Sequence, residues 1–209
     1  PVLRPDRPGH RVAVPTVIAA VVLAAGTSSR MGRTKQLLEL DGVTVLQHVL
    51  DTAAPEVDEI IVVLGHEADA IGSSLLLPGG ARVVVNPDYR SGQASSLQAG
   101  LRALGPETRA AVILLGDQPG MAADAVRAVI DAYDRTGGPV VQVWYRGRPG
   151  HPVLLDRGVW PEVEAIRGDI GARNLLAGRP DRVVAVEIPG DPPPDLDTWE
   201  DYRRIAGEH

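Results

Sequence analysis

Residues 22–35 read VLAAGTSSRMGRTK, and they continue an apolar run that begins at Val17. A short apolar run that ends at glycine is typical of a buried strand, so we predict a strand over 17–23 followed by a loop. Gly26 and Gly32 allow backbone conformations and close approaches that a side chain would prevent. The stretch therefore predicts the first strand and the ligand-binding loop of an open α/β sheet, because such sheets bind ligands beyond the carboxyl ends of their strands.

The loop carries groups that suit phosphate. Ser28, Ser29 and the backbone amides can donate hydrogen bonds to phosphate oxygens, and Arg30 and Lys35 can neutralise their charge. The loop has neither the glycine-lysine-serine/threonine ending of a P-loop nor the three-glycine fingerprint of a dinucleotide fold. The alternative is a plain strand-to-helix connection whose cations are solvated.

Strand-like and helix-like segments alternate through the rest of the chain, which predicts a mainly parallel, three-layer α/β/α sheet of the Rossmann-like type. Short strands around Gly147 suggest a hairpin or an edge excursion in the second half. We expect residues 1–16 to be a flexible extension and residues 17–209 to form a single domain. The predicted strands are 17–23, 59–64, 82–85, 110–115, 140–144, 153–155 and 183–188, and the predicted helices are 45–54, 67–77, 95–104, 122–133, 159–166, 172–176 and 198–206.

Composition excludes several classes of function. The 209 residues carry a net charge of -6, which argues against a general nucleic-acid binder, since such proteins present a basic face. The chain has no cysteine, which excludes disulfides, thiolate metal sites and a cysteine nucleophile and fits a cytoplasmic location. No segment reaches the roughly 18 apolar residues of a membrane helix, so we expect no membrane partner.

Asp117 is the strongest single candidate for chemistry. It follows the apolar strand predicted over 110–115, so its carboxylate should lie at the ligand edge of the sheet. A carboxylate there can hold Mg²⁺ together with nucleotide phosphates and water. The alternative role is an Asx-turn or a cap for the helix that begins near Ala122. A second carboxylate could come from Asp195 or Asp197, although Asp197 or Thr198 could instead cap the last helix.

In two further regions the residues could either bind a ligand or have a purely structural role. Asn86 and the serines after Gly92 could contact a ligand, or they could form a turn and cap a helix. His151 stands near Arg146 and Arg148, and these three potential cations would suit a phosphorylated acceptor, although a lone histidine is more often structural. The segment from Gly168 through Asp169 to Arg173 could border the same acceptor site or be an ordinary glycine-rich helix entry.

The ordered motifs resemble those of the molybdenum cofactor nucleotidyltransferases, and within that group the cytidylyltransferase branch is most similar. The resemblance spans nearly all of the chain after residue 16. The motif over 23–35 is joined, in the order typical of the family, by Asn86-Pro87, Gly92–Leu97, Leu115–Pro119, Gly150–Val153, Gly168–Arg173 and Asp195–Thr198.

The resemblance implies a nucleotidyltransferase fold of the GT-A-like type and transfer of CMP from CTP to molybdopterin, with Mg²⁺ as cofactor. It implies catalytic roles for Lys35, Arg30 and Asp117, metal ligation by Asp117 and Asp197, and acceptor binding by His151, Arg148, Asp169 and Arg173. A proline that follows the last acidic motif in the family is Trp199 here. The implied nucleotide-binding residues are Leu23, Ala24, Ala25, Gly26, Thr27, Ser28, Ser29, Lys35, Asn86, Gly92 and Ser96.

Guanylyl-transferring relatives tend to have glycine where this chain has Ala25, so the base preference rests on one methyl group. The same chemistry on a sugar or polyol phosphate is an alternative, as is a non-catalytic carrier that loads a molybdenum hydroxylase. A nicotinamide-dependent reductase would lack its usual glycine fingerprint here.

Overall fold

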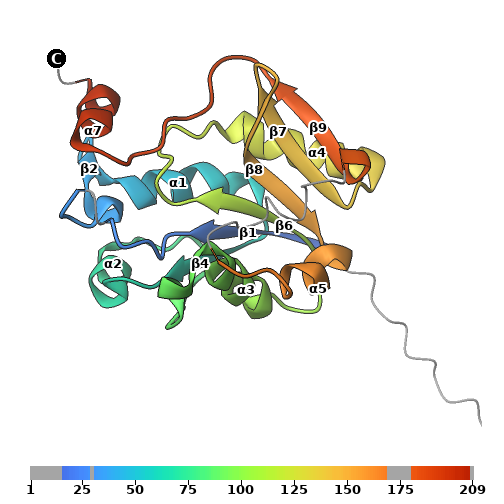
Figure 1. The fold of residues 1–209 in the computed structure, drawn as a ribbon, viewed down its shortest axis with the longest axis horizontal. Coiled ribbons are helices and arrows are strands. Elements are labelled where there is room, and N and C mark those ends of the chain that lie inside the picture. The colour runs from blue at the N-terminus through green and yellow to red at the C-terminus, as the bar shows by residue number, and fades with distance from the viewer. Residues whose placement is uncertain (1–15, 29–30, 169–179, 208–209) are drawn as a thin grey trace, which may run out of the picture.

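The computed structural model describes residues 16–28, 31–168 and 180–207. A seven-stranded sheet crosses the middle of the molecule in the order β5-β4-β1-β6-β8-β7-β9 (Figure 1). Strand β8 is antiparallel to both of its neighbours, and the other pairs are parallel, which confirms the mainly parallel sheet. The strands are β1 (Val17–Leu23), β4 (Glu59–Leu64), β5 (Ala81–Val85), β6 (Thr108–Leu115), β7 (Val140–Tyr145), β8 (Arg148–Asp156) and β9 (Val183–Ile188).

Helices cover both faces of this sheet, so the three-layer prediction is also confirmed (Figure 1). Helices α1 (Val45–Ala53), α2 (Ala68–Ser74) and α4 (Ala123–Thr136) pack on one face. Helices α3 (Gln93–Ala103) and α5 (Trp160–Val163) pack on the other. The last helix, α7 (Trp199–Ala206), lies at one end beside a small hairpin of β2 (Glu39–Leu40) and β3 (Val43–Thr44).

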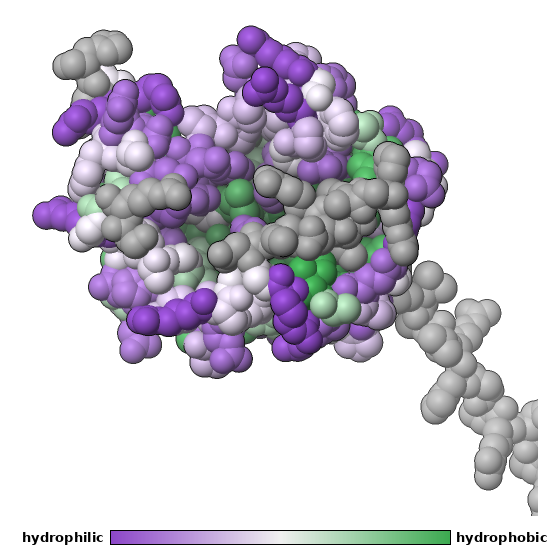
Figure 2. Space-filling model, viewed as in Figure 1, coloured by the Kyte–Doolittle hydropathy of each residue, from purple (hydrophilic) through white to green (hydrophobic). Residues whose placement is uncertain are grey.

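Strand β1 is apolar at every position because both of its faces are buried. In β1, Ala20 and Val22 belong to the core under α1 and α4, whereas Ala19 and Val21 belong to the core under α3. This alternation explains why parallel strands appear in the sequence as continuous apolar runs. In the space-filling view, hydrophilic residues dominate the rim of the visible face, and hydrophobic residues show mainly toward its middle (Figure 2).

Within the seven-stranded sheet, the β7–β8 hairpin produces the one reversal of strand direction. Its turn residues, Arg146 and Gly147, have φ angles of 49° and 73°. Positive φ at both central positions is the geometry that matches the twist of a two-residue hairpin. The short strands predicted around Gly147 therefore form a hairpin, and β8 inserts between β6 and β7.

Two predicted helices are shorter in the structure. The helix predicted over 67–77 spans Ala68–Ser74, because Ser73 and Ser74 turn their hydroxyl groups back to the backbone carbonyls of the preceding turn. The helix predicted over 159–166 keeps one short α-helical segment, and Gln98 caps its end by donating to the carbonyls of Val163 and Ile166, each at 2.9 Å. The β2–β3 hairpin was not predicted, and the segments predicted over 1–16 and 172–176 fall almost entirely outside the described residues.

Two adjacent strand ends define the edge at which the candidate site lies. Leu23 of β1 pairs with Leu115 of β6, and the next residue, Gly116, donates its backbone N–H to the carbonyl of Leu23 at 2.9 Å. The loops that follow β1 and β6 therefore leave the sheet side by side. Within the described residues, no helix is long and apolar enough to cross a membrane.

Candidate active site

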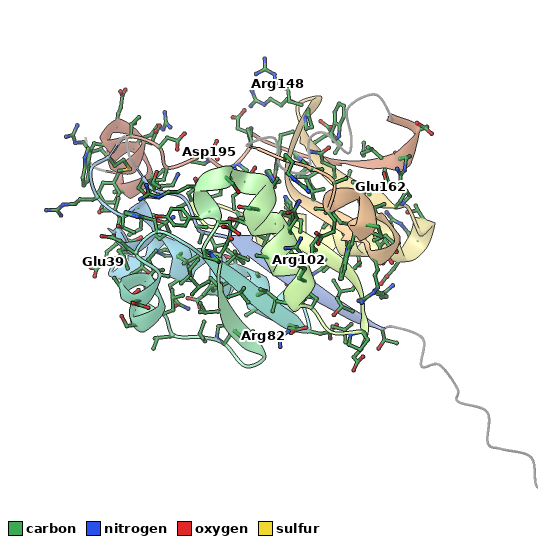
Figure 3. All side chains as sticks on the ribbon, turned by 60° about the horizontal axis from the view of Figure 1, so that its bottom comes forward. Glu39, Arg82, Arg102, Arg148, Glu162 and Asp195 are labelled. Atoms are coloured by element: carbon green, nitrogen blue, oxygen red, sulfur yellow. The ribbon has the colours of Figure 1, made fainter. Side chains whose placement is uncertain are left out.

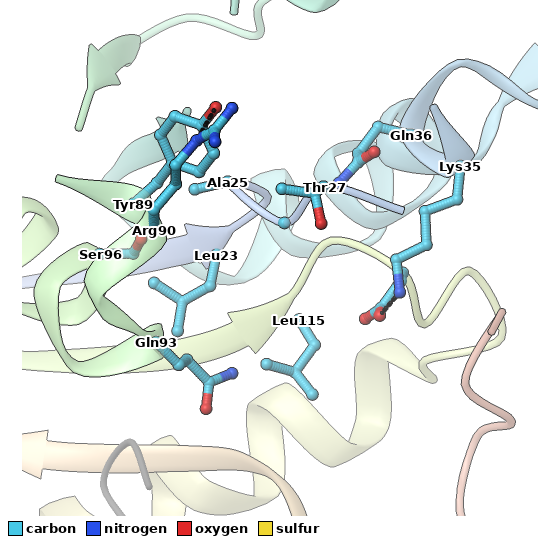
Figure 4. A pocket seen from close by; sticks show the side chains of 12 residues that line it. Leu23, Ala25, Thr27, Lys35, Gln36, Tyr89, Arg90, Gln93, Ser96 and Leu115 are labelled. Atoms are coloured by element: carbon cyan, nitrogen blue, oxygen red, sulfur yellow. Dashed lines mark hydrogen bonds and ion pairs between the residues drawn. The ribbon is translucent and has the colours of Figure 1, made fainter. Parts of the chain in front are cut away.

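A pocket of about 410 Å³ opens at the carboxyl ends of β1 and β6 (Figure 4). Leu23 and Leu115 form its apolar floor, with Ser96 and Tyr89 toward one end and Lys35 toward the other. Its volume is within the range of small-molecule sites, roughly 300–1,000 Å³. The lining residues are Leu23, Ala25, Gly26, Thr27, Lys35, Gln36, Tyr89, Arg90, Gln93, Ser96, Leu115 and Asp117.

The charged end of the pocket is built around Lys35. Its Nζ atom lies 2.5 Å from Oδ2 of Asp117 and 3.1 Å from Oδ1 of Asp197. Burial lowers the pKa of Lys35, but the two carboxylates outweigh that effect and leave the pKa above its ordinary value. Lys35 is therefore a cation at neutral pH, and it brings together two residues that are 80 positions apart in the sequence.

Asp117 does not take the capping role that its position also allowed. Helix α4 begins after Ala122 without any side-chain cap, and the Asp117 carboxylate is directed to Lys35 instead. The last helix is capped by Thr198, whose side chain accepts from the backbone N–H of Asp201 while the Asp201 carboxylate accepts from Thr198 in return. Asp197 is thus outside the cap and its carboxylate is directed to the pocket.

The loop after β1 is held by hydrogen bonds to the short 3₁₀ helix η1 (Lys35–Leu37). Ser28 accepts from the backbone N–H of Lys35 at 3.1 Å, and the buried Gln36 donates to the carbonyl of Ala24 at 3.2 Å. Ser28 has a φ of 50°, and its hydroxyl also contacts Gln36 at 3.3 Å. The Ser28 side chain therefore shapes the loop, and the Lys35 side chain extends from η1 to the pocket (Figure 4).

The other end of the pocket is formed by the start of α3 and the turn before it. Tyr89, Arg90 and Gln93 line this end, and Arg90 donates from Nε to the Tyr89 hydroxyl at 3.2 Å. Asn86 is buried behind the lining and donates to Ser95 and Ser96 at 2.9 and 3.0 Å. Ala24 and Gly92 are also buried without lining the pocket.

Several residues of the pocket could not be selected from the sequence. Gln36 has no feature that separates it from its neighbours, and Gln93 and Leu115 were parts of motifs without roles of their own. Tyr89 offered the best signal, because the chain has only four tyrosines and this one stands in a predicted loop near a strand end. Ser29, Arg30, Asp169 and Arg173 lie outside the described residues.

Of the predicted acceptor residues, the two that the structure describes, Arg148 and His151, do not line this pocket. Arg148 is exposed on the β7–β8 hairpin and points away from the rest of the molecule (Figure 3). His151 lies further along β8, where its backbone carbonyl accepts from the Tyr145 hydroxyl at 3.2 Å. Gly168 does lie near the pocket, since its carbonyl accepts from the backbone N–H of Ala94 at 3.1 Å.

Comparison with known proteins identifies the family. The family model of the MobA-like NTP transferase domain matches residues 20–183. The chain belongs to this family. It is 32% identical over 202 residues to the nicotine blue oxidoreductase of Paenarthrobacter nicotinovorans, with 90% of this chain and 96% of that protein covered. It is 28% identical over 142 residues to the molybdenum cofactor cytidylyltransferase of Escherichia coli K12, with 68% and 71% covered.

Solved structures agree with this family membership. The Rv0371c protein of Mycobacterium tuberculosis H37Rv is 36% identical and superposes with a TM-score of 0.84, covering 93% of this chain and all of that one. A second crystal structure of that protein, at 34% identity and a TM-score of 0.80, is a complex with manganese. The present chain thus has the nucleotidyltransferase fold that the motifs predicted, and a relative with the same fold binds a divalent cation.

Proposed function

We propose that this protein transfers CMP from CTP to a phosphorylated acceptor, with molybdopterin as the first candidate, and releases pyrophosphate. The observation that carries the proposal is that the two ends of the pocket differ in charge. Ala25, Tyr89 and Ser96 offer a small, partly apolar end for a base, and Lys35 with Asp117 offers a charged end for the phosphates. The motif resemblance and the cytidylyltransferase relative support the choice of CTP.

The reaction needs alignment more than acid–base chemistry. An oxygen of the acceptor phosphate forms a bond to the α-phosphorus of CTP, and the bond from that phosphorus to the bridging oxygen breaks, so pyrophosphate leaves with the electron pair. The acceptor phosphate is already ionised near neutral pH, so no general base is required. The Lys35 ammonium would stabilise the negative charge that moves onto the leaving group.

The residues at the charged end fit a divalent cation. Asp117 and Asp197 supply carboxylate oxygens on either side of the Lys35 ammonium. No group of three or more histidine, cysteine, aspartate or glutamate side chains in the described segments could hold a metal ion, so phosphate oxygens and water would complete the coordination. We propose Mg²⁺, which when bound would neutralise charge on the phosphates. The manganese complex of the relative supports a cation of this kind.

Relatives with different names define the alternatives. One relative, similar over nearly its full length, is named an oxidoreductase, and another, which matches 36% of this chain, is named a 2-C-methyl-D-erythritol 4-phosphate cytidylyltransferase. The ion pair between Lys35 and Asp117 supports a transferase over a non-catalytic carrier. A cytoplasmic location and a molybdenum hydroxylase partner remain predictions from the sequence.

A screen for pyrophosphate release tests the proposal. The purified protein would be assayed with each of the four ribonucleoside triphosphates against molybdopterin, a sugar phosphate and a polyol phosphate, with Mg²⁺ present. We expect release with CTP and molybdopterin and little with the other pairs. Release with another acceptor would change the substrate. No release with any pair, together with oxidation of a reduced nicotinamide cofactor in a parallel assay, would contradict the proposal.

A further inference from the structure

The segment Pro194–Asp197 is fixed against the residues that follow β6. The backbone N–H of Leu196 donates to the carbonyl of Asp117 at 3.1 Å. The Leu196 side chain is fully buried in a small apolar cluster with Met31, Leu40 and Val45. Leu196 therefore anchors the segment. The carboxylates of Asp195 and Asp197, on either side of it, are oriented by other contacts.

Gln118 makes one of those contacts. It follows Asp117 directly, it is 7% exposed, and its Nε2 donates to Oδ1 of Asp195 at 2.7 Å. Its Oε1 atom is buried and has no hydrogen-bond partner among the described residues. An unpaired buried oxygen is destabilising, so an amide at this position carries a cost that an apolar side chain would not. The stabilising contribution of this amide is its charge-assisted hydrogen bond to Asp195.

Asp195 and Asp197 make different contacts. Asp197 forms an ion pair with Lys35, as Asp117 does, whereas in the described part of the chain Asp195 forms none with Lys35 and accepts from Gln118. The two carboxylates of the segment are therefore held by different partners, that of Asp195 by Gln118 and that of Asp197 by Lys35.

We propose that Gln118 and Asp195 are a positioning pair. Their hydrogen bond holds the segment at the angle at which Asp197 faces Asp117, and Asp195 is not itself a cation ligand. The inference rests on the proposed function, in which Asp117 and Asp197 hold the divalent cation. Partners that orient metal ligands typically contribute about ten- to a hundredfold to metal affinity, so the pair should be measurable without any turnover.

The test is the affinity of the purified protein for Mn²⁺ alone, measured by electron paramagnetic resonance. Gln118→Met has nearly the same shape without the hydrogen bond, and it should weaken Mn²⁺ binding by about tenfold. Asp195→Asn loses the charge but keeps an oxygen that accepts from Gln118, and it should change the affinity by less than about threefold. Asp117→Asn is the control for the cation site and should lose most of the binding.

The outcomes separate this proposal from the proposed cation site. Mn²⁺ affinity of Gln118→Met within about twofold of the parent, or Asp195→Asn as weak as Asp117→Asn, would overturn the positioning pair and leave the cation site standing. An Asp117→Asn variant with unchanged affinity, or a parent that binds no Mn²⁺, would overturn both.

A second variant covers the case in which Gln118→Met does not fold. Asp195→Ala changes an exposed side chain and removes the acceptor, so it should also weaken Mn²⁺ binding by about tenfold while the melting temperature stays near that of the parent. If both variants fold, the double variant should bind Mn²⁺ no more weakly than either single one, because both remove the same hydrogen bond. Additive losses in the double variant would contradict the pair.

Discussion

The ammonium of Lys35 lies 2.5 Å from the carboxylate of Asp117, although the two residues come from separate loops at neighbouring strand ends. The Lys35 side chain is only 13% exposed and that of Asp117 is 21% exposed. A pair so shielded from water keeps its geometry better than a surface ion pair does. It therefore provides a fixed positive charge and a fixed carboxylate at the end of the pocket where we place the phosphates.

Lys35→Ala should reduce turnover by about two to three decades, because loss of one oriented group in such a site typically costs roughly 2.7–4 kcal/mol. The lysine is on a loop, so the melting temperature should change little. Steady-state kinetics with CTP and the acceptor, beside a thermal melt, measure both effects. Turnover that stays within about threefold of the parent would remove Lys35 from the mechanism.

Asp117→Asn should be more damaging than Asp197→Asn. The amide has nearly the same shape but lacks the charge that makes a carboxylate a good ligand for hard cations. Asp117 follows a buried strand and is 21% exposed, whereas Asp197 is 44% exposed on the C-terminal segment. The Mg²⁺ concentration needed for half-maximal activity should rise in both variants. Full activity of Asp117→Asn at ordinary Mg²⁺ would be incompatible with the site.

Ala25→Gly should raise the ratio of kcat/KM for GTP to that for CTP. The methyl group of Ala25 lines the pocket, and its removal enlarges the end at which we place the base. One methyl contact supports only about 1–3 kcal/mol of discrimination, so the preference should shift without reversing. If the ratio is unchanged, the base is read elsewhere, and Ser96 is the next position to vary.

Gly65→Ala should weaken nucleotide binding through Tyr89. A Cβ atom on Gly65 would lie 2.6 Å from Cβ and Cγ of Tyr89 and 3.0 Å from Cβ of Ala25, so Tyr89 would have to move. Calorimetric titration of CTP measures the loss. Gly79→Ala is the matched control, because a Cβ atom there meets no atom within 4 Å. Equal CTP affinity in both variants would show that the position of Tyr89 does not matter for binding.

Tyr133→Phe should change the alkaline stability of the fold. Burial, together with the hydrogen bond from its hydroxyl to Asp156 at 2.5 Å, raises the pKa of Tyr133 to about 12. Because the unfolded value is about 10, the stabilisation is complete below pH 10 and is lost as the pH rises toward 12. The parent should lose on the order of 2 kcal/mol more than the variant across this range, measured by urea unfolding. Parallel curves for the two proteins would contradict this assignment.

The sequence by itself determined the layers of the fold and the loop at residues 24–35. A continuous apolar run such as the one that forms β1 is typical of a strand buried on both faces, and the glycines and cations after β1 mark the ligand edge. These are local properties, since each depends on neighbours within a few positions. The same local reasoning located Lys35 and Asp117 as separate candidates.

Only the tertiary structure decided which candidates meet. The sequence left Asp195 and Asp197 as alternatives, and the structure pairs Asp197 with Lys35 and Asp195 with Gln118. Leu196 lies 79 positions after Asp117 in the chain, yet its side chain is buried and its backbone N–H donates to the carbonyl of Asp117. This long-range packing fixes where the neighbouring carboxylates point. Tyr89 lines the pocket for a similar reason, because its side chain packs closely against the backbone of Gly65, 24 positions earlier in the chain.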